Sequence, residues 1–490
     1  MTQEYRQPQG RVSPGNPDEA LVRCARPSEP GSTMIFDPFT IGNVTFKNRL
    51  IRSSIGGRTA YYDGTVSNAW KNFELRFAQN GVAAIVSATL NVDPYRWSPL
   101  EYPQISNDKF IKHLSEGIAA IHGQDCRYII QIGDGGSHVQ TSLFPQSQDS
   151  LGPSPGFDLF YGYRSRRTEM TVADIEHSVA EFGNAARRVR EAGADGVEVT
   201  ASKGYLIHQF LNPAINRRRD DYGGSMAKRF RLLREVIGAV RAQVGADFLL
   251  GVRLSAKDCN YLPLNFRLPL PLETEQYRGN DAGTYVTYAK WLKDLGVDYL
   301  HVSNGYGFIN PGETPGDFPL DEVKMFANST RHLSTKAAMR AGLLNVIPDR
   351  LLRRVLSTGW GATEAANLPD ARRLRDDVGL PVIANGAFQR RSVVESALTS
   401  GGCDLVSMAR PLLANPDLPR LFAEGVEEPE RPCTFCNRCA IRTTLFPLGC
   451  YEPLRFDSTD AMEAQIIDWS ARPDLEEPLA WDPTTETSES

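Results

Sequence analysis

The sequence lacks an apolar run of the roughly 20 residues needed to cross a bilayer. It also lacks the apolar core of a secretory signal, because residues 1–33 are rich in proline, glycine and charged side chains. Neither sign of charge dominates: 54 Lys and Arg stand against 59 Asp and Glu, so the net charge is −5 and no broad basic surface for nucleic acid is expected. We therefore expect a cytoplasmic protein that binds neither membranes nor nucleic acid.

The length of 490 residues exceeds one minimal domain and fits a barrel of roughly 250–400 residues with extensions. We expect a flexible leader over 1–33, a barrel over 34–426, a cysteine-containing extension over 427–456 and an acidic tail over 457–490. The tail is rich in acidic residues, Thr, Ser and Pro, so we expect it to pack loosely or to remain unstructured.

Eight short apolar runs recur along the chain, and helical patterns follow most of them. Val, Ile and Leu dominate these runs with little alternation, as in parallel strands that are buried on both faces. The expected strands are Leu50–Ser54, Ala83–Ala88, Arg127–Ile132, Asp195–Thr200, Phe248–Leu254, Asp298–Ser303, Pro381–Asn385 and Asp404–Ala409. Amphipathic stretches predict helices at Val172–Ala192, Ser225–Val244, Ala282–Leu295, Ala365–Asp377 and Arg391–Ser400.

Eight strands that alternate with helices predict an α/β fold, either a closed (β/α)8 barrel (a TIM barrel) or an open doubly wound sheet. An open dinucleotide-binding sheet carries Gly-x-Gly-x-x-Gly after an early strand, and no such motif stands there. The pattern therefore favours the barrel. Two segments after the fifth and sixth strands, 257–281 and 305–367, exceed ordinary loop length. We expect both to shape a substrate pocket at the barrel mouth, and the second to contain helices of its own.

Polar residues stand at several strand ends, where barrel enzymes place their ligands. The segments 385–387 and 409–411 follow the seventh and eighth strands, and such segments often hold a phosphate through backbone N–H groups and an arginine. Gln131 ends the third strand, and Arg253 lies inside the apolar fifth strand. The alternatives are a turn glycine, an arginine at a helix start and, for Arg253, an internal salt bridge.

Several longer segments resemble one known family. The opening FDPFTIGNVTFKNRLIRSS is similar to the first strand of old yellow enzymes, and GVEVTASKGYLIHQFLNPAINRRRDDYGGSMAKRFRLLREVI resembles the family's most recognisable block. The segments PVIANGAF and DLVSMARPLLANPDLPR are similar to its flavin phosphate segments. The resemblance covers residues 34–456. It implies a barrel that holds FMN without a covalent bond and transfers hydride through flavin N5.

The resemblance also implies which side chains contact FMN. Gln131 would contact the flavin ring, Arg253 would face its N1/O2 edge, and Arg410 would lie at the phosphate end. The full set implied by position is Ser53, Ser54, Ile55, Gly56, Ala88, Gln131, Arg253, Ser303, Asn304, Asn385, Gly386, Ala409 and Arg410.

Three residues after the fourth strand are the candidates for catalysis. Tyr205 matches the tyrosine that commonly donates a proton to the substrate carbon opposite the hydride, although a packing tyrosine is the alternative. Where the family usually has a His–His or His–Asn pair for the substrate carbonyl, this chain has Thr200 and Lys203. Lys203 could donate to a carbonyl oxygen, contact a substrate carboxylate, or lie as a solvated charge at the rim. This departure leaves the substrate class open.

Four of the eight cysteines, Cys433, Cys436, Cys439 and Cys450, follow the pattern C-x2-C-x2-C-x10-C. A tight cluster in a large chain without a secretory signal favours a metal centre over disulfides. Four thiolates can hold a 4Fe–4S cluster or a zinc ion, and unligated cysteines are the third interpretation. The resemblance favours the 4Fe–4S cluster, because the branch with 2,4-dienoyl-CoA reductase and trimethylamine dehydrogenase carries one at a similar place.

Three functions are compatible with these features. The first is an NAD(P)H-dependent ene-reductase that reduces a carbonyl-activated C=C bond, with Tyr205 as the proton donor. The second is an FMN/Fe–S amine dehydrogenase or demethylase, and the third is a zinc-bearing binding module without enzymatic activity. We expect a small-molecule substrate and NAD(P)H as the reductant, with an external electron carrier as an alternative source of electrons. Members of the family often form homo-oligomers.

Overall fold

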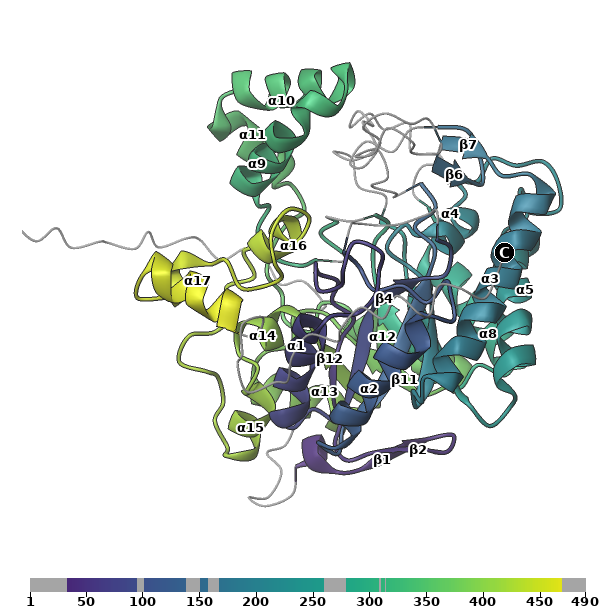
Figure 1. Ribbon diagram of the computed structural model, residues 1–490, viewed down its shortest axis with the longest axis horizontal. Coiled ribbons are helices and arrows are strands. Elements are labelled where there is room, and N and C mark those ends of the chain that lie inside the picture. The colour runs from purple at the N-terminus through teal and green to yellow at the C-terminus, as the bar shows by residue number, and fades with distance from the viewer. Residues whose placement is uncertain are drawn as a thin grey trace, which may run out of the picture. The chain divides into compact units, whose positions relative to one another are not determined.

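The computed structural model describes residues 33–94, 101–137, 150–156, 167–259, 279–307, 310–312 and 314–468. Within them, eight strands close into a barrel (Figure 1) in the order β10-β11-β12-β3-β4-β5-β8-β9. These strands are β3 (Leu50–Arg52), β4 (Ala84–Asn91), β5 (Arg127–Gly133), β8 (Gly196–Ala201), β9 (Leu249–Ser255), β10 (Tyr299–Ser303), β11 (Val382–Ala384) and β12 (Leu405–Met408). Each predicted strand overlaps one of them, which confirms the (β/α)8 barrel.

All neighbouring barrel strands pair in parallel. For example, Val197 in β8 lies opposite Leu250 in β9, and Val252 in β9 lies opposite Leu300 in β10. Every residue of β4, β8, β9 and β10 is buried, because one face of each strand fills the barrel and the other lies under helices. This double burial explains why the strands appear in the sequence as continuous apolar runs.

The five predicted helices form, and side chains cap the start of the two longest. Helix α3 (Val172–Glu191) begins after Thr171, which forms a capping box with Asp174, and α5 (Met226–Val244) begins after Ser225, whose side chain also caps it. The other three predicted helices are α8 (Ala282–Asp294), α12 (Leu368–Val378) and α13 (Arg391–Thr399). Further helices around the barrel are α1 (Asn68–Gln79), α2 (Phe110–His122), α4 (Leu206–Leu211), α14 (Arg410–Ala414) and α15 (Leu418–Ala423).

Two short strand pairs lie outside the barrel. The antiparallel pair β1 (Phe39–Ile41) and β2 (Val44–Phe46) packs its apolar residues against Ile51, Leu249 and other residues near the strand starts. It therefore covers the amino-terminal end of the barrel, away from the predicted site. The second pair is β6 (Ser150–Gly152) with β7 (Arg167–Glu169). None of the helices in the described part of the chain has the length and apolar character to cross a membrane.

The long segment after β10 contains helices of its own, as predicted: α9 (Leu320–Thr330), α10 (Thr335–Val346) and α11 (Asp349–Leu356). The segment 257–281 after β9, in contrast, lies mostly outside the described residues. So does the predicted leader except for Thr33, and so does the tail from 469 onward. The described start of the tail forms α17 (Thr459–Asp468), which buries Met462 and Ile466 against Tyr451. Part of the tail is therefore a packed helix rather than a loose segment.

Candidate active site

Side chains at the carboxyl ends of four barrel strands meet in one hydrogen-bonded group. Ser53 and Ser54 follow β3, and the Oγ of Ser53 accepts a bond of 3.1 Å from Nη1 of Arg253 in β9. The hydroxyl of Ser54 donates to Oε1 of Gln131 in β5 at 3.1 Å. The Nε2 of Gln131 in turn donates to Glu198 in β8 at 2.6 Å. Five residues from four segments of the chain, four of them predicted flavin contacts, thus share one site.

Glu198 is the buried centre of this group. Its Oε2 accepts a 3.0 Å bond from the hydroxyl of Tyr299 and lies 3.0 Å from Nδ1 of His301. Burial alone would raise the pKa of Glu198, but His301, Arg253 and Gln131 outweigh burial and lower it. Burial, together with Arg253, lowers the pKa of His301. The carboxylate is therefore ionised and the imidazole neutral, and the carboxylate balances the charge of Arg253.

Arg253 is a predicted site residue because it is a charged residue in an apolar run. Glu198 and His301 stand in equally apolar runs, GVEVT and DYLHV, but were not predicted. The same signal would have found them, since buried charged residues require partners. The charge of Arg253 acts on Glu198 inside the barrel, and this interaction is compatible with a role of Arg253 at the site.

Buried polar atoms without partners test whether this site fits a flavin. Among the described residues, Thr200 Oγ1 at the end of β8 and Ser303 Oγ at the end of β10 have no hydrogen-bond partner, and neither does Oδ1 of Asn304. Each such atom costs about 1–3 kcal/mol if nothing satisfies it. Together with Arg253 and Gln131, they form a set of donors and acceptors suited to the pyrimidine edge and ribityl chain of FMN.

In the first predicted phosphate segment, the main chain at Gly386 packs closely against the backbone of residues 366–367. Gly386 has a φ of +133°, and a Cβ there would lie 2.8 Å from the backbone nitrogen of Asn367, so only glycine fits. The Oδ1 of Asn385 accepts a 2.9 Å bond from the same Asn367. Ala409 immediately precedes α14. The phosphate contacts themselves stay predictions.

Arg410 at the start of α14 points elsewhere in this structure. Its Nη1 donates to the carbonyl oxygen of Pro315 at 2.7 Å and also to Oδ1 of Asn437. It also lies over the ring of Phe435 at 5.1 Å. The guanidinium group therefore contacts the cysteine extension, and its contact with phosphate stays a prediction.

The remaining predicted flavin contacts lie on the second strand and after the first. Ala88 is buried in β4, and Ile55 is half-buried. Gly56 lies directly against the ring of Tyr102, which would overlap any side chain at that position. Glycine at position 56 therefore allows the close packing of Tyr102, and the contact of this segment with the flavin stays a prediction.

A tight turn after β8 presents the candidate catalytic residues. Lys203 and Gly204 have left-handed φ values of +58° and +78°, and half-buried Tyr205 immediately precedes α4. The backbone N–H of Gly204 donates to Nδ1 of His208 at 3.0 Å. Because Nδ1 accepts, Nε2 carries the proton, and it lies 2.7 Å from the carboxylate of Asp258. This buried pair fixes the turn that carries Lys203 and Tyr205.

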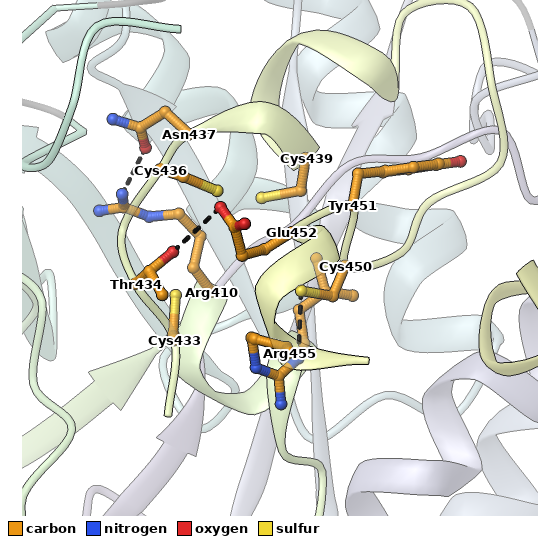
Figure 2. Close-up of a pocket in the computed structure, with 11 residues that line it drawn as sticks. Arg410, Cys433, Thr434, Cys436, Asn437, Cys439, Cys450, Tyr451, Glu452 and Arg455 are labelled. Atoms are coloured by element: carbon orange, nitrogen blue, oxygen red, sulfur yellow. Dashed lines mark hydrogen bonds between the residues drawn. The ribbon is translucent and has the colours of Figure 1, made fainter. Parts of the chain in front are cut away.

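The four predicted metal ligands line one pocket, together with Arg410, Glu452 and Arg455 (Figure 2). Phe435 and Asn437 have left-handed φ values of +54° and +59°, which turn the chain between Cys433, Cys436 and Cys439. Burial, and then the nearness of Cys433 and Cys450, raises the pKa of Cys439 well above its ordinary value. The four thiols therefore lie close together, and no disulfide joins them.

Two N–H groups already donate to sulfur atoms of this pocket. Arg455 Nη1 lies 3.1 Å from Sγ of Cys450, and the backbone N–H of Phe435 lies 3.4 Å from Sγ of Cys433. Such donors are typical around iron–sulfur clusters, so the donor set fits one. No group of His, Cys, Asp or Glu in the described part of the chain stands at metal-binding geometry, and the identity of the metal stays a prediction.

Comparison with known proteins gives consistent matches. A model of the NADH:flavin oxidoreductase / NADH oxidase family matches residues 34–263 and 354–428. The NADPH dehydrogenase of Geobacillus sp. is 30% identical over 401 residues, which cover 80% of this chain and 94% of that protein. The NADH oxidase of Thermoanaerobacter brockii is 26% identical over 412 residues, which cover 82% of this chain and 52% of that protein. The chain thus spans about half the length of the latter relative.

A solved structure shows the same fold. The 2-naphthoyl-CoA reductase bound to 2-naphthoyl-CoA superposes with a TM-score of 0.68 at 22% identity, over 85% of this chain and 56% of that one. The segment 264–353, which contains α9, α10 and most of α11, lies outside the family match, as does the cysteine segment after residue 428.

Proposed function

The chain belongs to the NADH:flavin oxidoreductase / NADH oxidase family, as its resemblance to old yellow enzymes predicts, and we propose that it is an NAD(P)H-dependent, FMN-containing ene-reductase. Its substrate is a small molecule with a C=C bond activated by a carbonyl group. We propose that the barrel spans residues 34–426 and the cysteine extension residues 427–456. The observation that carries it is the ring of buried polar groups at the strand ends, with the turn of Tyr205 beside it.

FMN, when bound, supplies the hydride through its N5 atom. Arg253, held by Ser53, would face the N1/O2 edge, where its positive charge would stabilise negative charge on the flavin. The carboxylate of Glu198 fixes Gln131 through its Nε2, so that Gln131 presents a fixed orientation to the ring. Backbone N–H groups around Gly386 would hold the phosphate, and Arg410 would have to leave Pro315 and Asn437 to join them.

The substrate meets the turn after β8. Lys203 donates to the carbonyl oxygen, in place of the family's usual pair, and Thr200 offers its unpartnered hydroxyl next to it. Tyr205 donates the proton to the carbon opposite the hydride. His208 and Asp258 act on Tyr205 only through the turn, which they hold in place.

The four cysteines would bind a 4Fe–4S cluster, with a zinc ion as the alternative. The extension that carries them contacts the predicted flavin segment directly: Thr443 Oγ1 donates to the carbonyl of Gly56 at 3.2 Å. This contact also favours the second candidate, an amine dehydrogenase or demethylase that passes single electrons from flavin to cluster. Membership in a family of oxidoreductases argues against the third hypothesis, a binding module without activity.

The test begins with protein purified without air. Flavin bands at roughly 370 and 450 nm over a broad brown shoulder establish FMN and an iron–sulfur cluster. NAD(P)H should reduce the flavin, and a panel of enones should reoxidise it. The variant Tyr205→Phe should retain FMN and its reduction by NAD(P)H but slow the reoxidation about 100-fold or more.

Two results would contradict the proposal. If no enone reoxidises the flavin while small amines reduce it without NAD(P)H, the amine-oxidising function replaces it. A colourless protein that takes up no added FMN rules out both functions.

A further inference from the structure

Helices α10 and α11 expose an apolar surface. We define the insertion face by Met339, Leu343 and Val346 of α10 and Leu351 and Val355 of α11, whose exposed fractions are 70, 52, 81, 51 and 59%. Their spacing of three or four residues places each set on one side of its helix. A group of large apolar side chains this exposed is typical of a protein-binding surface.

The surroundings of the insertion face are basic, in a chain that is acidic overall. Residues 320–360 contain seven Lys and Arg but three Asp and Glu, whereas the whole chain has a net charge of −5. Two of the acidic residues are neutralised within the insertion, Asp321 by Arg353 and Asp349 by Lys324. Arg350 and Arg354 of α11 are exposed and form no ion pair with any described residue. The apolar side chains therefore lie within positive charge.

The positive charge indicates which kind of protein can bind the insertion face. A second copy of the chain would bring the same positive groups together and be repelled. A partner with an acidic surface would instead be attracted, and apolar contacts surrounded by complementary charge are typical of small, transient interfaces that form quickly. Electron-transfer proteins use interfaces of this size class.

The insertion is attached to the cysteine extension. Phe326, Leu333 and Ala337 pack with Ile441 of α16 (Arg438–Arg442), the helix that contains Cys439. Buried Glu322 of α9 pairs with Arg442 at 2.8 Å and with Arg438 at 3.4 Å.

A second connection joins the start of the insertion to the cysteine turn. The Nδ2 of Asn437 donates to the carbonyl oxygens of Thr314 and Asp317 at 3.1 and 3.0 Å. The insertion therefore contacts both the cysteine turn and α16, and both of these elements carry cysteines of the pocket. A protein bound to α10 therefore docks on an element that packs directly against the cysteine-bearing segment.

We propose that the insertion face docks a small, acidic, one-electron carrier protein of the ferredoxin or flavodoxin kind. This inference rests on the proposed redox function. Two successive encounters deliver one electron each, and with two protons from solvent these reduce one C=C bond while two carriers are oxidised. The carrier is then a second source of electrons beside NAD(P)H.

The experiment measures binding of the full-length holoprotein to a plant-type 2Fe–2S ferredoxin, with basic cytochrome c as the control carrier. Ferredoxin should bind at about 20 mM salt and at least about 10-fold more weakly at about 300 mM. The double variant Arg350→Glu/Arg354→Glu should weaken binding at least 10-fold at low salt. The matched control Arg234→Glu, which changes an exposed arginine of α5, should leave it unchanged, and circular dichroism should show both variants folded.

Several results would overturn the inference. These are unchanged affinity in the double variant, equal binding of cytochrome c, self-association that the double variant abolishes, or binding to phosphatidylglycerol vesicles without binding to ferredoxin. NAD(P)H-dependent enone reduction is measured on the same proteins. If the wild type reduces no enone but binds ferredoxin through the arginines, the ene-reductase function fails and the docking surface stands.

Discussion

The Nε2 of His208 lies 2.7 Å from Oδ1 of Asp258, and both side chains are fully buried beside the turn that carries Tyr205. The other oxygen of Asp258 accepts a 2.6 Å bond from the backbone N–H of Asn280. The hydroxyl of Tyr285 also donates to Asp258, and burial, followed by the charge of Asp258, raises the pKa of Tyr285 well above its ordinary value. Asp258 thus accepts three hydrogen bonds, from His208 in α4, from Asn280 just before α8 and from Tyr285 within α8.

The variant Asp258→Asn should destabilise the protein and slow turnover. An amide can accept from His208, but its NH2 group then faces the N–H of Asn280, and one buried donor loses its partner. The cost should be about 1–3 kcal/mol in the free energy of unfolding, measured by urea titration. The control Tyr285→Phe removes one bond and leaves the carboxylate, so about 1 kcal/mol is expected. Equal stability and turnover in Asp258→Asn and the wild type would contradict a positioning role.

Lys203 should support activity but lower the stability of the protein. Its φ of +58° strains a residue with a side chain by about 1 kcal/mol or more. Lys203→Gly should therefore raise the unfolding free energy by roughly 0.5–1 kcal/mol and lower kcat/KM for enones at least about 10-fold, since the donor to the carbonyl is lost. The control Asp125→Gly relieves a similar φ of +50° at an exposed turn and should stabilise the protein without changing activity. If Lys203→Gly keeps full activity, Lys203 is a solvated rim charge.

The barrel could be predicted because its strands are buried on both faces, so each appears as one apolar run with a helix after it. Gly386 and the four cysteines could be predicted from local patterns. The network of Glu198, His301 and Arg253 could not, because its members lie on different strands and nothing local indicates which residues pair. His208 stands within the apolar LIHQF, and its partner Asp258 follows 50 residues later. The direction of the Arg410 side chain likewise depends on Pro315 and Asn437, which the sequence does not bring together.

Acid should destabilise the fold through Glu198 and His301. The pKa of His301 lies below its ordinary value of 6.5 in the folded chain, so the unfolded chain takes up a proton first and stability falls below about pH 6.5. The pKa of Glu198 lies below its ordinary value of 4.5, so its stabilisation is complete above about pH 4.5 and is lost as the pH falls through the folded value. Both groups therefore lower the stability of the fold as the pH falls.

The variant His301→Gln separates these two contributions. Its melting temperature should depend less on pH than that of the wild type between about pH 6.5 and 4.5, while part of the loss below about pH 4.5 remains, because Arg253 and Gln131 still lower the pKa of Glu198. His332→Gln, at an exposed histidine, serves as the control and should follow the wild type. Parallel curves for His301→Gln and the wild type would show that His301 does not set the acid response.

The cysteine pocket should hold iron and sulfide in a way that depends on all four thiols. Cys439→Ser removes the thiol that lies next to Cys433 and Cys450, and a hydroxyl replaces a thiolate poorly as a ligand to iron. Iron should fall from about four to below about one atom per chain, with loss of the brown absorption, while FMN content stays unchanged. The control Cys259→Ser changes an exposed thiol outside the pocket and should keep all the iron. One zinc per chain and no sulfide in the wild type would assign the pocket to zinc, and it would then hold the extension against Gly56 without carrying electrons.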